Sequence, residues 1–150
     1  MTDIGFYHLT RSGLEQALPQ LLTKTMQAGK RALIVLGSDQ RLTAIDDLLW
    51  TFDKPSWLPH GRSKADHPED HPILLTTDDA NTNQATFLFL ADGGASDHVA
   101  DYERCFEIFD GHDDEVVAAA RARWKTYKEA DHTLTYWQQT ERGWENTASG

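Results

Sequence analysis

Four side chains that could ligate a metal lie between residues 60 and 71. His60, His67, Asp70 and His71 supply imidazoles and a carboxylate, the groups that bind zinc when they converge, and such a site would support metal-dependent hydrolysis. No HExxH helix or CxxC pair accompanies them, and acidic loops flanked by proline are usually solvated. We therefore predict no metal and no cofactor, and keep a metal-dependent hydrolase as the rival hypothesis.

The usual motifs for nucleotide chemistry and nucleophilic catalysis are missing. Thr10–Leu14, at the first expected strand-to-helix turn, contains neither GxxxxGKS/T nor GxGxxG. Asp92-Gly93-Gly94 follows an expected strand but lacks the remaining glycine and the lysine, which favours a plain turn. No serine or cysteine lies in a nucleophile elbow, and Cys105 sits in an apolar run that predicts a buried thiol. We expect no catalytic residue.

The most informative segment is a helix expected from about Asp113 to Ala130, which carries two stripes of side chains when projected at about 100° per residue. The stripe expected to pack against a sheet consists of Val116, Ala119, Ala120 and Tyr127. The adjacent stripe consists of Val117, Arg121, Trp124 and Lys128, with Lys125 beside it. An apolar pocket rimmed by these cations would suit an acidic peptide that ends in an aromatic residue and a free carboxylate. A solvated basic face beside a tryptophan at the edge of the core explains the pattern equally well.

A second aromatic cluster comprises Trp50, Trp57, Leu58 and Pro59, where a helix gives way to a long connection over residues 53–72. Loops that carry rigid aromatic residues and prolines make good docking surfaces. A tryptophan that caps the core is an equally good interpretation, so both alternatives stay open.

Alternating strands and helices are expected to position these side chains. Strands are predicted at 4–9, 31–36, 73–76, 86–90, 106–109 and 133–139, and helices at about 12–28, 39–52, 97–104 and 113–130. Pro19 predicts that the first helix either starts near Leu18 or kinks there. The alternation predicts an α/β fold with three layers, a mostly parallel sheet carrying helices on both faces.

Length, charge and hydropathy limit the possible partners. The 150 residues fit one domain, 1–150, and the small polar ending from Trp144 predicts fraying. A net charge of -10 argues against direct nucleic-acid binding, and the apolar runs are too short to cross a membrane. No signal peptide is readable, so we expect a cytoplasmic protein whose partners are proteins.

Three segments resemble, in order and spacing, the chi subunit of bacterial DNA polymerase III. They are Asp47-Leu48-Leu49-Trp50, Ser56-Trp57-Leu58-Pro59-His60 and Arg121-Ala122-Arg123-Trp124-Lys125-Thr126-Tyr127-Lys128. Phe6-Tyr7 and Gly29-Lys30-Arg31 add weaker matches, so the resemblance runs through most of the chain. It implies a Rossmann-like fold without a nucleotide site, in a non-catalytic accessory protein of the clamp loader within the bacterial replisome.

The resemblance also implies two partner surfaces. Chi proteins bind the acidic C-terminal tail of single-stranded DNA-binding protein, and their tail-binding arginine and aromatic residue match Arg121 and Trp124. A basic residue of some chi proteins falls on Val117, a departure for which Lys125 or Lys128 would compensate. The segment with Trp50, Trp57, Leu58 and Pro59 matches the surface for the psi subunit, or for a helicase-like protein that competes for it.

Overall fold

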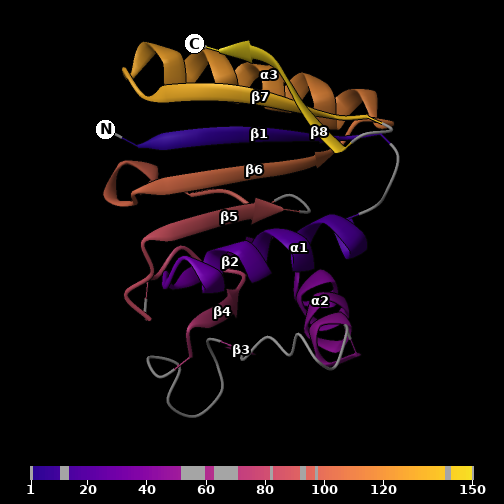
Figure 1. The fold of residues 1–150 in the computed structure, drawn as a ribbon, viewed down its shortest axis with the longest axis vertical. Coiled ribbons are helices and arrows are strands. Elements are labelled where there is room, and N and C mark those ends of the chain that lie inside the picture. Colours follow the sequence, from indigo (N-terminus) through magenta and orange to yellow (C-terminus); the bar gives the residue numbers. More distant parts are fainter. Residues whose placement is uncertain are drawn as a thin grey trace.

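The structure of the chain is a computed structural model that describes residues 2–10, 14–51, 60–62, 71–81, 83–91, 94–96, 98–140 and 143–149. Its centre is an eight-stranded sheet with the strand order β3-β4-β2-β5-β6-β1-β7-β8 (Figure 1). The strands are β1 (Asp3–Leu9), β2 (Ala32–Leu36), β3 (His60–Arg62), β4 (Ile73–Thr76), β5 (Phe87–Ala91), β6 (Arg104–Asp110), β7 (Thr133–Thr140) and β8 (Gly143–Ser149). All neighbouring strands are parallel except β7 and β8, which confirms the mostly parallel sheet.

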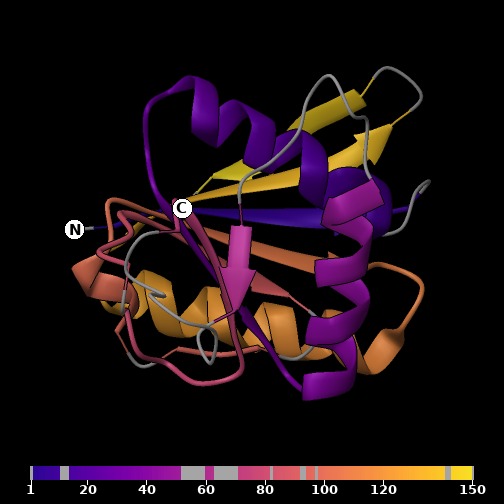
Figure 2. The same ribbon diagram turned by 90° about the horizontal axis from the view of Figure 1, so that it is seen from below.

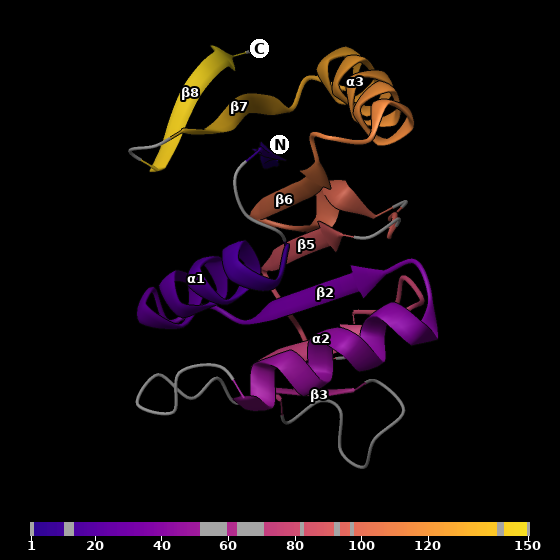
Figure 3. The same ribbon diagram turned by 90° about the vertical axis from the view of Figure 1, so that its right-hand side faces the viewer.

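Helices cover both faces of this sheet and complete the three predicted layers. They are α1 (Leu14–Gln27), α2 (Asp39–Thr51) and α3 (Asp114–Glu129). The helices α1 and α2 pack on one face and α3 on the other, as Figure 2 shows for α1 and α3. Along the sheet, α3 lies towards the β7 end and α2 towards the β3 end (Figure 3). None of the helices that the structure describes is long and apolar enough to cross a membrane.

Side-chain alternation explains why the sheet has two apolar faces. In β1, Ile4 and Phe6 belong to the core under α3, whereas Tyr7 and Leu9 belong to the core under α1 and α2. All five residues of β2 are buried, as expected for a central parallel strand covered on both sides. The sheet therefore holds two separate cores, and a side chain's place along a strand decides which one it joins.

The first helix begins at Leu14 and continues through Pro19, so a start near Leu18 was wrong. A proline inside a helix removes one backbone donor. Leu18 and Leu22 are fully buried against the sheet, and packing of an apolar face supplies most of a helix's stability in a folded protein. After the helix, Gly29 has a φ of 72°, a left-handed conformation that glycine commonly adopts at helix ends.

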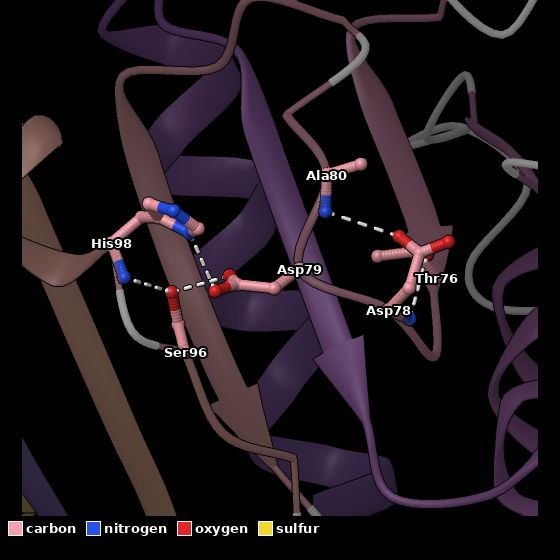
Figure 4. A network of polar contacts seen from close by, with 6 residues as sticks. All are labelled: Thr76, Asp78, Asp79, Ala80, Ser96 and His98. Atoms are coloured by element: carbon pink, nitrogen blue, oxygen red, sulfur yellow. Dashed lines mark hydrogen bonds and ion pairs between the residues drawn. The ribbon is translucent and has the colours of Figure 1, made fainter.

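The prediction of a helix over residues 97–104 was wrong. Among the described residues of this segment, only the 3₁₀ helix η3 (Val99–Asp101) is helical, and β6 already starts at Arg104. Strand pairing explains the early start, because Arg104 is in register with Asp3 of β1 and with Phe87 of β5. The adjacent connections are joined by polar contacts in place of a helix (Figure 4).

These contacts link the β4–β5 connection to the β5–β6 connection. Asp79 accepts a hydrogen bond from the Ser96 hydroxyl at 2.5 Å, and its second carboxylate oxygen lies 2.6 Å from Nδ1 of His98 (Figure 4). The backbone N–H of His98 donates to the Ser96 hydroxyl at 3.0 Å. The network therefore holds together two segments that are far apart in sequence on the α3 side of the sheet.

Two short strands were not anticipated from the sequence. The strand β3 lies inside the segment 53–72, which we expected to be one connection, and pairs with β4. The strand β8 extends the sheet beyond β7, where we had expected the last strand to end at Gln139. In β8, Trp144 packs edge-on against Tyr7 with 5.1 Å between ring centroids. The single domain and the fraying after Trp144 stay predictions.

Candidate functional site

The predicted 113–130 helix is present as α3, and a side chain caps its N-terminus. The Asp113 carboxylate accepts from the backbone N–H groups of Glu115 and Val116, at 3.0 and 3.4 Å. Such a cap satisfies donors that have no partner inside the helix. Ala120, at 1% exposure, anchors the middle of the helix on the sheet. The two sides of α3 are therefore set by this contact.

The side of α3 that faces the sheet holds a buried charge that sequence reasoning missed. Glu107 of β6 is 2% exposed and accepts from Arg123 Nε at 2.6 Å and from the Tyr127 hydroxyl at 2.9 Å. Burial raises the pKa of Glu107, while Arg123 and the Tyr127 hydrogen bond oppose that rise. Burial and nearby Glu107 raise the pKa of Tyr127. A glutamate in the apolar run from Cys105 to Phe109 was the available signal for a buried partner.

The predicted core stripe needs one correction. Ala119 is exposed, whereas Ala120 is buried and both Val116 and Tyr127 are partly buried against the α3 core. Only a narrow strip of the helix surface contacts the sheet, and Ala119 lies just outside that strip. Arg123 takes a place on the inward side because its guanidinium reaches Glu107.

Trp124 is held at the edge of the core. Its ring centroid lies 5.3 Å from that of Phe6 and 5.9 Å from that of Tyr136, both in edge-to-face geometry. Its side chain is only partly buried, and so is that of Val117, which packs against the same core. Anchored aromatic rings with one exposed part make apolar contacts at little entropic cost. The tryptophan thus edges the core and also offers a fixed apolar wall.

Three cations stand beside this wall. Arg121, Lys125 and Lys128 are exposed, and none makes a hydrogen bond or ion pair within the part of the chain that the structure describes. Residues three or four apart on a helix are neighbours, so Arg121 lies beside both Trp124 and Lys125. The predicted stripe is therefore assembled on the solvent side of α3, with its cations unpaired.

The guanidinium of Arg121 also acts on His8 of β1 and Tyr136 of β7. His8 of β1 places Nδ1 2.6 Å from the Tyr136 hydroxyl of β7. Burial lowers the pKa of His8, and Arg121 and His112 lower it further. Burial raises the pKa of Tyr136, against the opposing effect of Arg121. The positive charge of Arg121 therefore influences side chains of the adjacent strands β1 and β7.

The other sequence-predicted sites are only partly covered by the structure. Trp50 lies in the last turn of α2, and residues 57–59 lie outside the described residues, as do His67 and Asp70. His60 begins β3, and the ring of His71 packs directly over the Gly61 backbone of that strand. In the described ranges no group of three or more potential ligands could hold a metal. The hydrolase hypothesis gains no support.

Cys105 is the one thiol of the chain, and it lies in the core under α3 at 1% exposure. Burial raises its pKa well above the usual value, and nearby Glu107 raises it further. A neutral, enclosed thiol is a poor nucleophile. Cys105 therefore offers no reactive thiolate beside α3.

The chain matches one protein family and one curated relative. A family described as "DNA polymerase III chi subunit, HolC" matches residues 1–135. A protein named "Probable DNA polymerase III subunit chi", from Rickettsia prowazekii (strain Madrid E), is 23% identical over 90 residues, which are 60% of this chain and 54% of that protein. The matching part thus spans about half the length of that relative, whereas the family match includes all of α3.

Proposed function

This chain belongs to the DNA polymerase III chi subunit family, whose members function in DNA replication, and we propose that it is a non-catalytic adaptor. In this proposal it binds the acidic C-terminal tail of single-stranded DNA-binding protein and links that protein to the clamp loader. The observation that supports the proposal is the solvent side of α3. There a half-buried Trp124 stands beside the unpaired cations Arg121, Lys125 and Lys128.

Each part of this surface has a role in the proposed complex. Trp124 provides an apolar wall for the terminal phenylalanine of the tail, and Arg121 pairs with its carboxylate. Lys125 or Lys128 attracts the upstream aspartates and compensates for the apolar Val117. Exposed ion pairs contribute only about 0.2 to 1 kcal/mol each, so the apolar contact supplies much of the affinity and the charges supply selection.

Calorimetric titration with a short acidic peptide that ends in phenylalanine tests the proposal. We expect a dissociation constant on the order of micromolar, which weakens as salt is added. Arg121→Ala and Trp124→Ala, each shown to be folded, should abolish the binding. Lys30→Ala is the matched control, since it removes an exposed positive charge that pairs with Glu103 far from α3.

Three results would count against the proposal. They are no binding by the wild-type protein, equal binding of a peptide whose carboxylate is an amide, and an affinity that does not change between low and moderate salt. The last result would remove the charge part of the mechanism and leave the apolar part. Loss of binding in Lys30→Ala as well would show a general charge effect instead of a site.

We also propose that the segment with Trp50, Trp57, Leu58 and Pro59 forms the second interface, for psi or an equivalent clamp-loader component, with a helicase-like protein as a competitor. Its support is the chi family membership and the position of Trp50 at the end of α2. Co-purification with the clamp-loader subunits tests it: Trp57→Ala should lose them while keeping the acidic peptide. Retention of those subunits would overturn this second assignment.

A further inference from the structure

A cavity of about 320 Å³ lies on the face of the sheet opposite to α3. It opens to solvent, and its lining residues come from the C-terminal half of α1, from the β7–β8 hairpin and from the strands β1, β5 and β6. Figure 3 shows where α1, β7 and β8 lie along the sheet. Its aromatic lining residues are Tyr7, Phe87, Phe106, Trp137 and Trp144. No part of the α3 surface contributes to it, so this is a separate candidate binding site.

The aromatic rings of this cavity hold one another in place. Tyr7 stacks on Phe106 with 5.6 Å between ring centroids and on Trp137 at 6.4 Å, while Trp144 meets Tyr7 edge-on. Trp137 and Trp144 remain only partly buried, because they sit at the margin of the core under α1. Rings fixed in this way form a preorganised apolar surface, which favours a flat ligand.

Two cations line the same cavity. The guanidinium carbon of Arg104 lies 5.0 Å from the Phe106 ring centroid and 5.7 Å from that of Phe87. Its Nε is buried and has no hydrogen-bond partner in the described part of the chain. Lys24 of α1 is exposed and likewise unpaired there. Neither the Arg104 guanidinium nor the Lys24 ammonium has an ion pair with a carboxylate in the described part of the chain, so an anionic oxygen placed in this cavity would be bound favourably.

We propose that this cavity binds a small aromatic carboxylate. The ring of the ligand packs against the wall of the cavity formed by Tyr7, Trp137 and Trp144, and the carboxylate accepts hydrogen bonds from Arg104 and Lys24. A nucleotide also combines a flat ring with negative charge. It suits the cavity less well, because most of the lining is apolar and a sugar would add several polar groups against it.

One neighbouring charge works against the anion and provides a sensitive test. Asp3 of β1 is in register with Arg104 of β6, on the same face of the sheet, yet makes no ion pair with it. The carboxylate of Asp3 and that of a bound ligand would both be attracted to Arg104 and would repel each other. Removing the charge of Asp3 should therefore strengthen binding, an effect that loss of structure would not produce.

The experiment follows the tryptophan indole N–H signals of the full chain by NMR during titration with N-acetyl-L-phenylalanine. The signals are assigned with Trp137→Phe and Trp144→Phe. We expect saturable shifts of Trp137 and Trp144 that persist in Arg121→Ala, whatever shift the same probe causes at Trp124, since its carboxylate and ring also resemble the end of the peptide proposed for α3. Binding at Trp137 and Trp144 should be at least about tenfold weaker for N-acetyl-L-phenylalaninamide, which lacks the carboxylate. Equal binding of the amide, or tighter binding of adenosine monophosphate, would overturn the proposal.

Three variants locate the site. Arg104→Met keeps an apolar stem over the two phenylalanine rings and should weaken binding about tenfold, while Asp3→Asn should strengthen it about threefold. Arg121→Ala should leave it unchanged, which separates this cavity from the α3 surface. Unchanged affinity in a folded Arg104→Met protein would overturn the assignment. If that variant does not fold, failure of Asp3→Asn to strengthen binding overturns it instead.

Discussion

The side of α3 that faces the sheet and the side that faces solvent hold their arginines in different ways. Arg123 on the inner side donates to Glu107 at 2.6 Å, and that glutamate is 2% exposed. Arg121 on the outer side is exposed and has no polar partner in the described part of the chain. The inner arginine thus compensates a buried charge, whereas the outer one is available to an external anion.

This difference shows that one residue type can have two roles within a single helical turn. Arg121 and Arg123 are two positions apart, which turns them about 200° from each other around the helix axis. A buried ion pair adds little compared with an apolar pair of the same shape, but losing one partner leaves an uncompensated charge. The inner side should therefore control stability, and the outer side should control binding.

The largest effect expected from this comparison is on stability. Arg123→Met should lower the free energy of unfolding by about 3 to 5 kcal/mol, because Glu107 remains buried without its cation. Arg121→Met is the matched control and should change it by no more than about 0.5 kcal/mol. Urea unfolding followed by circular dichroism measures both. Similar losses in the two variants would contradict the distinction between the sides.

The second prediction concerns the pH dependence of that loss. Burial raises the pKa of Glu107 above its usual value of 4.5, and Arg123 opposes the rise, so Arg123→Met should raise it further. A raised pKa means that the folded state holds the proton more tightly, so its contribution to stability is present below pH 4.5 and is lost as pH increases through the folded-state pKa.

The stability deficit of Arg123→Met should therefore shrink as the pH falls from neutral towards 4.5. Unfolding curves at several pH values measure it, with the double variant Glu107→Gln and Arg123→Met as the control. The double variant has no carboxylate to titrate at this position, so its deficit should depend much less on pH. Parallel pH profiles for the single and double variants would rule out Glu107 as the cause.

A smaller effect on stability is expected for Trp124, which belongs to both sides of the comparison. Trp124→Ala should cost about 2 kcal/mol, below the range for fully buried aromatics, because only part of the ring packs on Phe6 and Tyr136. Trp124→Phe should recover most of that stability. Thermal unfolding measures both variants. No loss in Trp124→Ala would mean that the ring is not anchored on the core.

The sequence was sufficient for the parts of the fold that repeat a simple pattern. The strands around Ile4, Ile34 and Phe89 are apolar runs between turns, and their order predicted the three layers and the mostly parallel sheet. The end of the sheet could not be predicted in this way. The strand β8 depends on pairing with β7 and on the contact of Trp144 with Tyr7, which are tertiary interactions without a local pattern.

The stripe with Arg121 on α3 was predictable from helical spacing, whereas the role of Arg123 was not. Helical spacing placed Val117, Arg121 and Trp124 on one face, and the structure has them on the solvent-side edge of the α3 core. Spacing could not reveal that Arg123 reaches a glutamate on another element. The cavity under α1 was missed for the same reason, because its lining comes from six different elements.

The smallest expected effect concerns the charge of the outer arginine. Burial and Arg121 both lower the pKa of His8, so protonation of this ring opposes folding, and stability should fall as the pH decreases below 6.5. Arg121→Met should raise the pKa of His8 towards that value, as measured by NMR titration of the ring protons. Lys125→Met is the control and should leave it unchanged. If neither variant changes the pKa of His8, then Arg121 does not influence this ring.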